Sequence, residues 1–331
     1  MDLSVGTPVD PVPELVRSAL AAAADAPGYP RAAGSPALRE AVASYLATSC
    51  GADPDRLGLL PTIGSKELVA GLPVALGLGP GDRVVIPTVC YPTYQLGATL
   101  AGATVVRADH PEQAPETARL VWLNSPANPT GAVLAPDRLR DWVAWARSRS
   151  AVLASDECYL ALGWETTPVS VLAACDGRYD RVLAVHSLSK RSNLAGYRAG
   201  FVAGDPELVA GLLELRRHAG LLVPAPVQAA MVAALADEAH VAAQRARYAA
   251  RRDQLRAALA GAGFTVARSE AGLYLWATRS EDCWSTVDWL AGRGILVSPG
   301  EFYGPAGARH VRVALTATDE RVAAAVARLS G

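Results

Sequence analysis

The sequence predicts an α/β fold in which a large, mostly parallel sheet is covered by helices, with a smaller α+β domain after it. Short continuous runs of valine, leucine and isoleucine alternate with longer stretches rich in alanine and arginine. Runs without polar alternation are typical of strands that are buried on both faces. From about residue 226 the pattern changes to one long helical stretch followed by short mixed elements. This order favours a parallel sheet first and an α+β domain second.

The elements of the first part follow this alternation along the chain. Strands are expected at the apolar runs 83–87, 104–108, 119–123, 151–155, 181–186 and 199–203. Several of the intervening segments begin at proline or aspartate, which the first turn of a helix prefers. Helices are therefore expected over 66–76, 92–101, 137–149 and 206–218.

The second part begins with a helical stretch over 227–261, broken at most near Asp237, which is expected to connect two domains. After it we expect strands over 264–269, 273–278, 295–298 and 310–315, and helices over 285–293 and from Asp319. A single core rarely grows beyond about 250 to 300 residues. We therefore expect a large α/β domain over 26–236 and a small α+β domain formed by 1–25 and 237–331.

Composition argues against several classes of function. The net charge is −1 and no basic tract is present, so nucleic acid is not an expected partner. No apolar stretch approaches the roughly 18 to 20 residues that span a bilayer, and the first residues do not resemble a signal peptide. We expect a cytoplasmic protein. The five cysteines lack a Cys-x-x-Cys pair and the five histidines lack metal-ligand spacing, which predicts reduced thiols and no metal site.

Lysine occurs only at Lys66 and Lys190, beside twenty-nine arginines. Arginine stays protonated in proteins, whereas a desolvated lysine can lose its proton and act as a nucleophile in Schiff-base chemistry. Lys190 follows the predicted strand 181–186 directly, within Ser187-Leu188-Ser189-Lys190. The alternative is a surface lysine left in an arginine-rich composition. The pattern makes Lys190 a candidate for imine formation.

Several distinctive polar residues fall at or just after the carboxyl ends of predicted strands, the edge where open α/β sheets bind ligands. Each alone could be a packed aromatic, a turn former or a helix cap. Together they supply a lysine for an aldehyde, an acid for a ring nitrogen and donors for a phenolic oxygen, as pyridoxal 5′-phosphate requires. These residues are Tyr91, Asn128, Asp156, Ser187 and Lys190.

Three motifs occur with the order and spacing of a known family. They are Asn128-Pro129-Thr130-Gly131, Asp156-Glu157-Cys158-Tyr159, and Ser187-Leu188-Ser189-Lys190 with Arg198. Over nearly its whole length the chain resembles the PLP-dependent, fold-type I, class I/II aminotransferases. Segments 60–68, 186–201, 269–276 and 299–304 are similar to actinobacterial N-succinyldiaminopimelate aminotransferases.

The resemblance implies roles for the residues around the cofactor ring. Lys190 would hold the cofactor as an internal aldimine and then move the proton between the substrate carbon and the cofactor. Asp156 would pair with the pyridine nitrogen and keep it protonated. Asn128 and Tyr159 would donate hydrogen bonds to the phenolic oxygen, and Tyr91 would stack on the ring.

The cofactor phosphate would bind where Gly64-Ser65-Lys66 opens a helix, because backbone N–H groups and the helix dipole favour a dianion there. Ser187 and Arg198 would complete this phosphate cup. Lys66 either contributes to the cup or extends to solvent. Tyr29 resembles the family tyrosine that reaches a phosphate in the neighbouring subunit, which implies a homodimer with shared sites.

On the substrate side, Arg312 matches the family arginine that clamps the α-carboxylate, and Asn128 is expected to contact the substrate as well. Gly6 resembles a residue of the amino-terminal loop that covers the substrate. A long dicarboxylate needs either a second cation or a row of amide donors far from Arg312, and Arg31, Lys66 and Arg191 are the candidate cations. Two acids, Glu270 and Glu301, either line the pocket or cap turns.

The resemblance implies ping-pong amino transfer between glutamate and N-succinyl-2-amino-6-ketopimelate in diaminopimelate and lysine biosynthesis, through a pyridoxamine phosphate form. Alternatives on the same fold are an aminotransferase for another amino acid and a C–S lyase. A non-catalytic PLP-binding regulatory module is an alternative from another class. A nucleotide-binding α/β protein is disfavoured, since no Gly-x-Gly-x-x-Gly follows the first strand.

Overall fold

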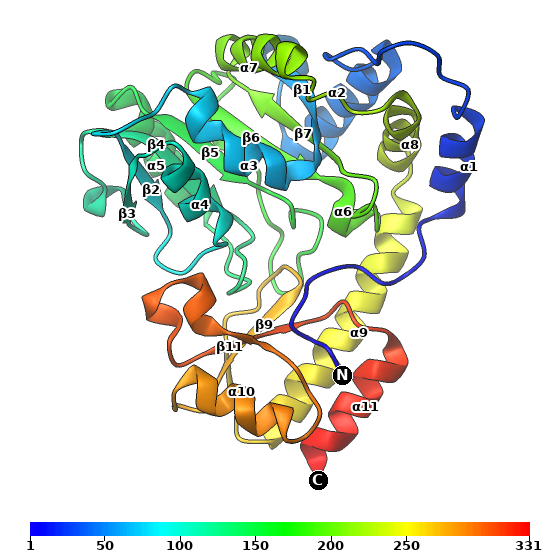
Figure 1. Ribbon diagram of the computed structural model, residues 1–331, viewed down its shortest axis with the longest axis vertical. Coiled ribbons are helices and arrows are strands. Elements are labelled where there is room, and N and C mark those ends of the chain that lie inside the picture. The colour runs from blue at the N-terminus through cyan, green and yellow to red at the C-terminus, as the bar shows by residue number, and fades with distance from the viewer.

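A seven-stranded sheet forms the centre of the large domain in the computed structural model, which describes residues 1–331 (Figure 1). The strand order is β1-β7-β6-β5-β4-β2-β3, and only β7 runs antiparallel to its neighbours. The predicted α/β class and the six predicted strands are confirmed. The bounds are β1(Gly58–Ile63), β2(Arg83–Ile86), β3(Thr104–Arg107), β4(Ala118–Asn124), β5(Val152–Asp156), β6(Val182–Ser187) and β7(Ala199–Gly204).

The strand register aligns the polar residues at one edge of this sheet. Asn124, the last residue of β4, pairs with Asp156, the last residue of β5. At the other end of the sheet, Ile63 of β1 pairs with Ala199 of β7. This pairing places Gly64, which follows Ile63, beside Arg198, which precedes Ala199. Because these pairings are fixed by strands buried on both faces, the polar ends have little freedom to move apart.

Helices cover both faces of the large sheet (Figure 1). One core forms beneath three helices, α3(Gly64–Ala75), α4(Thr93–Leu100) and α7(Pro206–Ala219). A second core forms beneath α2(Pro36–Cys50), α5(Pro136–Ser148) and α8(Ala225–Ala236). The bounds of α3, α4, α5 and α7 match the predicted helices within about two residues. No prediction was made for α2, which begins after the capping residue Ser35.

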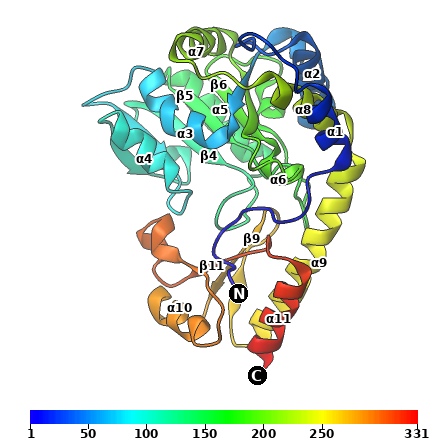
Figure 2. The ribbon, with the colours of Figure 1, turned by 45° about the vertical axis from the view of Figure 1, so that its right-hand side comes forward.

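The small domain contains an antiparallel sheet in the order β10-β11-β9-β8. The long helix α9 extends from the large domain down to this sheet and packs against α11 (Figure 2). The predicted break near Asp237 separates α8 from α9. The bounds are α9(Ala239–Gly261), β8(Thr265–Ala267), β9(Tyr274–Thr278), α10(Cys283–Ala291), β10(Ser298–Pro299), β11(Val311–Ala314) and α11(Asp319–Ser330).

The amino-terminal segment is shared between the two domains, which corrects the expectation that 1–25 belongs to the small one. Leu3 is buried in the small-domain core, and its neighbour Asp2 forms a bridge with Leu296. Leu296 belongs to the predicted strand 295–298. The observed strand β10 begins only at the last residue of that prediction, Ser298. In contrast, α1(Glu14–Ala22) packs on α8, because its buried Val16 joins the large-domain core.

The remaining short elements are 3-10 turns at η1(Pro54–Arg56), η2(Pro111–Gln113), η3(Val171–Cys175), η4(Gly300–Tyr303) and η5(Pro305–Gly307). None of the helices combines the length and the apolar character that crossing a bilayer requires.

Candidate active site

A cleft of about 630 Å³ lies where the carboxyl ends of the large-domain strands face the small-domain sheet. Its walls come from the amino-terminal segment and from both domains. Most residues singled out in the sequence line it, namely Gly6, Ser65, Lys66, Tyr91, Asn128, Asp156, Tyr159, Ser187, Lys190, Arg198 and Arg312.

Lys190 lies in α6(Leu188–Arg191), a single turn after β6 that is capped by the Ser187 hydroxyl. Its Nζ donates a hydrogen bond to the Gly6 carbonyl of the amino-terminal segment. Burial lowers the pKa of Lys190, and the nearby positive charge of Arg312 acts in the same direction. A larger fraction of the amine is therefore neutral, which is the form that attacks an aldehyde.

Asp156 is a buried carboxylate at the end of β5. Oδ2 accepts a hydrogen bond from the Tyr94 hydroxyl at 2.8 Å, and Oδ1 accepts one from the Cys158 backbone N–H at 3.2 Å. Burial raises the pKa of Asp156, while these two hydrogen bonds favour its ionised form. The carboxylate therefore suits a cationic partner that enters the cleft.

Asn124 connects the cleft residues of neighbouring strands. Its Nδ2 donates to the Asp156 carbonyl at 2.9 Å and to the Pro126 carbonyl at 3.1 Å. Its Oδ1 accepts a hydrogen bond from the Asn128 backbone N–H at 2.7 Å. The buried amide of Asn124 thus fixes the backbone at both Asp156 and Asn128, the two residues predicted to bind the cofactor ring.

Arg312 occupies β11 at the opposite wall and is 7% exposed. Nη1 donates to Asn128 Oδ1 at 3.0 Å, and Nη2 donates to the Ser4 carbonyl at 2.6 Å. The guanidinium lies 4.0 Å from the ring centroid of Tyr274 and 4.9 Å from that of Tyr303. Aromatic contacts and fixed acceptors hold the guanidinium in one orientation, as recognition of a carboxylate requires.

The start of α3 forms a tight turn against Arg198. Gly64 has a φ of +67°, and its N–H donates to the Arg198 carbonyl at 2.7 Å. The positive φ favours glycine, and a Cβ at this position would lie 2.5 Å from Arg198 Nη2 and would push that guanidinium aside. The next residue, Ser65, opens toward the cleft at the positive end of the helix dipole, which suits an anionic group.

Comparison with known proteins identifies this arrangement. The family described as aminotransferase class I and II matches residues 1–329. The chain belongs to this family. It is 62% identical over 334 residues to a Mycobacterium tuberculosis protein named as a probable aminotransferase, covering 100% of this chain and 80% of the relative. It is also 59% identical over 333 residues to the 4-dedimethylamino-4-oxo-anhydrotetracycline transaminase OxyQ of Streptomyces rimosus, covering 100% and 93%.

Solved aminotransferase structures share the fold. The N-succinyldiaminopimelate aminotransferase from Mycobacterium tuberculosis superposes with a TM-score of 0.90 at 29% identity, covering 99% of this chain and 92% of that one. A double mutant of the Thermus thermophilus aspartate aminotransferase gives a TM-score of 0.91 at 27% identity, covering 99% and 90%. The fold is therefore that of the fold-type I enzymes.

The cofactor of this aminotransferase is pyridoxal 5′-phosphate, and the cleft fits it chemically. Asp156 is buried with two donors but without a cation, which a protonated pyridine nitrogen would supply. Arg198 and the start of α3 form a cradle so close that a Cβ on Gly64 would fill it. Lys190 presents a half-buried amine to the same cleft.

Several residues that contact the predicted site residues had no role assigned from the sequence. Tyr94 donates to Asp156 from inside α4, and the hydroxyl oxygens of Tyr274 and Tyr159 lie 3.2 Å apart. Asn124 is the one with a sequence signal, because it ends a predicted strand at the edge where ligand-binding residues were expected. Position at a strand end could have identified it.

Other residues named in the sequence lie outside the cleft. Tyr29 is 96% exposed on the loop before α2, so its expected contact with a neighbouring subunit stays a prediction. Arg191, the last residue of α6, is buried and pairs with Glu238 at 2.6 Å. Glu270 accepts a hydrogen bond from the Val133 backbone N–H at 2.9 Å, so it anchors a turn rather than lining the pocket.

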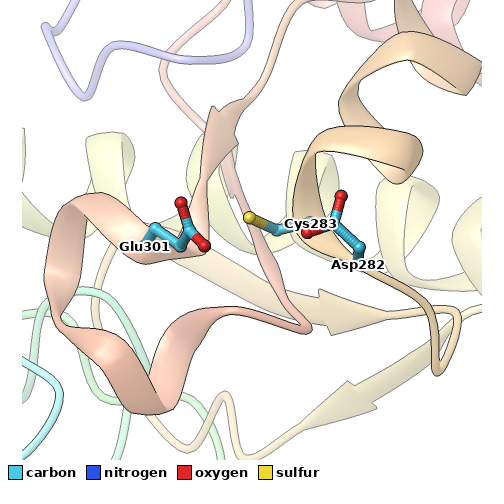
Figure 3. A group of neighbouring side chains, drawn as sticks. All are labelled: Asp282, Cys283 and Glu301. Atoms are coloured by element: carbon cyan, nitrogen blue, oxygen red, sulfur yellow. The ribbon is translucent and has the colours of Figure 1, made fainter.

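A grouping of possible metal ligands, none of which lines the cleft, forms where Asp282, Cys283 and Glu301 approach one another (Figure 3). Asp282 Oδ2 caps α10 by accepting from the Trp284 and Ser285 backbone N–H groups, each at 3.0 Å. Glu301 Oε2 accepts from Trp284 Nε1 at 2.9 Å. Both acids thus have structural roles, and the grouping provides no basis for a metal assignment.

Proposed function

We propose that this aminotransferase exchanges an amino group between glutamate and N-succinyl-2-amino-6-ketopimelate, the amino-transfer step of diaminopimelate formation. The observation that carries the reaction type is the placement of Lys190, Asp156 and Arg312 around one cleft. Pyridoxal 5′-phosphate, when bound, supplies the electron sink that makes the α-proton of an amino acid acidic.

Each protein residue then has a defined task in the proposal. Arg312 binds the α-carboxylate through paired N–H groups and fixes the substrate carbon over the reaction centre. Lys190 takes the proton from that carbon as a general base. Asp156 keeps the pyridine nitrogen protonated, and Asn128 with Tyr159 directs hydrogen bonds at the phenolic oxygen.

Lys66 is the proposed partner for the distal carboxylate of the succinylated substrate. Of the three cations considered from the sequence, it alone lines the cleft. Arg31 is exposed outside the cleft, and Arg191 is buried in its pair with Glu238. Lys66 Nζ lies 5.8 Å from the ring centroid of Tyr91, and both residues line the cleft. The ammonium is therefore on the same side of the cleft as Tyr91.

A second candidate acceptor is a tetracycline-type ketone, which the 59% identity with the Streptomyces rimosus transaminase favours. The two acceptors differ in charge, because only the succinylated substrate carries a distal carboxylate. Dependence on a cation at position 66 therefore distinguishes them.

The test measures amino transfer from glutamate to each acceptor with the wild-type enzyme and with Lys66→Gln. The proposal predicts turnover of the succinylated substrate and a rise in its KM of roughly tenfold in Lys66→Gln, as expected for losing one charged contact. The KM for glutamate should change much less. Arg31→Gln is the matched control. Turnover of the tetracycline-type ketone alone would replace the proposed substrate by the second candidate.

A lyase on the same fold is tested by a single turnover with glutamate. Amino transfer yields stoichiometric 2-oxoglutarate and leaves the amino group on the cofactor. Release of ammonia and pyruvate from a cysteine-type substrate, without 2-oxoglutarate from glutamate, would reject the aminotransferase assignment.

We also propose a homodimer in which Tyr29 of each subunit reaches the phosphate cup of the other. A tyrosine that is 96% exposed, on a loop outside its own cleft, supports this arrangement. Light scattering measures the mass of the assembly. Tyr29→Phe should weaken cofactor binding but leave this mass unchanged. A monomeric active enzyme would contradict the shared site.

A further inference from the structure

Tyr274 occupies a position that the proposed reaction does not yet explain. It is the first residue of β9 in the small domain and is 4% exposed. Its hydroxyl lies 3.2 Å from the hydroxyl of Tyr159, which belongs to the large domain. Its ring lies under the guanidinium of Arg312 at 4.0 Å. One side chain therefore contacts both a proposed cofactor-binding residue and the proposed carboxylate clamp.

We infer that Tyr274 is a positioning residue with two separable tasks: its hydroxyl orients Tyr159, and its ring holds Arg312. The inference rests on the proposed roles of Tyr159 and Arg312, and it gives a task to a residue that lies in the similar segment 269–276 but had no role assigned to it.

The hydroxyl task follows from counting protons. A tyrosine hydroxyl has one proton to donate and lone pairs to accept with. If Tyr159 donates its proton to the phenolic oxygen of the cofactor, its own oxygen can only accept from Tyr274. Hydrogen bonds in such a chain strengthen one another, particularly where water is excluded. Tyr274 thereby fixes the direction of the Tyr159 proton and makes it a stronger donor.

The amino-terminal segment closes this hydroxyl pair from solvent. A Cβ placed on Gly6 would lie 2.0 Å from the Tyr274 hydroxyl oxygen, so the backbone of Gly6 passes directly over it. Tyr159 is itself 6% exposed. Water has little access to compete for the bond between the two hydroxyls, which favours the ordered chain of donors.

The ring task follows from the surroundings of Arg312. Its Nη1 and Nη2 are fixed by Asn128 and by the Ser4 carbonyl, both of which lie at the edge of the planar group. An aromatic ring against the face restrains the remaining freedom and adds a cation–π contact. The hydroxyl of Tyr274 is not needed for this, so phenylalanine at the same position should preserve it.

The experiment uses the PLP-loaded enzyme and the variants Tyr274→Phe, Tyr274→Leu, Tyr159→Phe and the double phenylalanine variant. The first readout is the midpoint pH at which the visible absorption of the bound cofactor changes. The second is the KM for glutamate. Tyr303→Phe is the matched control for the first readout, because Tyr303 also lies near Arg312 but forms no hydrogen bond with Tyr159. Cofactor content and melting temperature are recorded for each variant.

We expect Tyr274→Phe to raise the absorption midpoint by about half a pH unit to one unit, the equivalent of one neutral hydrogen bond. The KM for glutamate should remain within about twofold, since the cation–π contact is retained. Tyr274→Leu should raise that KM by roughly tenfold, the scale of a lost buried cation–π contact. In the Tyr159→Phe background, Tyr274→Phe should produce no further shift.

Three results would overturn the inference. A midpoint that moves in Tyr159→Phe but not in Tyr274→Phe removes the hydroxyl task. Equal KM effects of Tyr274→Phe and Tyr274→Leu remove the separation of tasks. Additive shifts in the double variant remove the route through Tyr159. In contrast, an unchanged midpoint in Tyr159→Phe itself rejects the proposed role of Tyr159, so the two failures are distinguishable. If Tyr274→Leu does not fold, the phenylalanine variants still decide the hydroxyl task.

Discussion

Arg312 donates a hydrogen bond to the side chain of Asn128 at 3.0 Å, which joins the small-domain strand β11 to the large-domain loop after β4. The proposed clamp for substrate and the proposed donor to the cofactor are therefore in direct contact. A change at either residue should affect the binding of both molecules.

Arg312→Lys tests the clamp. Lysine keeps the charge but has neither the planar face for Tyr274 nor paired donors for a carboxylate. We expect the KM for glutamate to rise by roughly tenfold to a hundredfold, the scale of a lost charge-assisted hydrogen bond. Steady-state kinetics measure it, with the neighbouring exposed residue changed in Arg309→Lys as the control. A KM equal to that of the wild type would assign carboxylate binding to another residue.

Asp156→Asn tests whether charge or shape matters beneath the cofactor ring. The amide has the size of the carboxylate but cannot stabilise a protonated pyridine nitrogen. We expect cofactor to remain bound through Lys190 while kcat falls by about a hundredfold or more, the scale of losing one electrostatic partner of developing charge. Absorption spectra and kcat are compared in the same preparation. Full activity would show that the ring nitrogen needs no anion here.

Asn124→Ala tests the buried amide that connects β4 and β5. Removing it leaves the Asp156 carbonyl and the Asn128 N–H without this partner. We expect the free energy of unfolding to fall by about 1–3 kcal/mol, the cost of unsatisfied buried polar groups. Cofactor affinity should fall with it. Urea unfolding with and without PLP provides both values, and unaltered PLP affinity would limit Asn124 to a purely structural role.

Gly64→Ala tests the turn at the phosphate cup. Alanine at a φ of +67° is strained by about 1–2 kcal/mol, and its Cβ would displace the Arg198 guanidinium. We expect PLP to bind about tenfold more weakly, since about 1.4 kcal/mol corresponds to that factor. Gly220→Ala is the matched control, because Gly220 has a similar φ of +72° but no atom approaches a Cβ there. Equal effects of the two substitutions would point to a general loss of stability.

Glu157→Gln tests a buried acid next to Asp156. Burial raises the pKa of Glu157 from 4.5 to about 7, so the folded protein favours its protonated form. The protonated form of Glu157 therefore contributes to the free energy of unfolding. This contribution is fully present below the ordinary pKa of 4.5 and is lost as the pH rises through about 7. Burial also lowers the pKa of His186 to about 3, so its charging opposes folding as the pH falls. His186 Nε2 lies 3.6 Å from Glu157 Oε2, so the two groups are neighbours and the pH profile of His186→Asn is recorded beside that of Glu157→Gln.

We therefore expect the loss of stability between pH 5 and 8, measured by urea unfolding, to be roughly 2–3 kcal/mol smaller in Glu157→Gln than in the wild type. The exposed Glu40 provides the control variant Glu40→Gln. Parallel pH profiles for wild type and Glu157→Gln would show that Glu157 does not titrate in this range.

The fold was predictable where hydrophobic continuity determines it. Strands β2 and β4 to β7 are largely buried, so their apolar runs could be located without knowing their partners, whereas β3 at the sheet edge is at most half-buried. The pairing of β1 with β7 was not predictable, because it joins residues more than a hundred positions apart and no local pattern encodes it. The antiparallel direction of β7 was missed for the same reason.

The site was predictable where chemistry requires rare residue types in a fixed local order, as for Lys190 after its strand. Tyr94 and Tyr274 have no such order. Tyr94 meets Asp156 across 62 positions and Tyr274 meets Tyr159 across 115 positions. For a tyrosine inside a helix or strand, the sequence predicts only a packed aromatic side chain. The partner of its hydroxyl is known only once the fold is known.

The contact between Arg312 and the amino-terminal segment has a consequence for every measured affinity. Nη2 already has an acceptor in the Ser4 carbonyl, which also accepts from the Ser298 hydroxyl at 2.9 Å. Arginine has five N–H donors, so a carboxylate that accepts from the second N–H of Nη2 must share this nitrogen with the Ser4 carbonyl. Inhibition constants for small acids will then depend on the backbone of the amino-terminal segment, because the Ser4 carbonyl sets which N–H groups of Arg312 stay free.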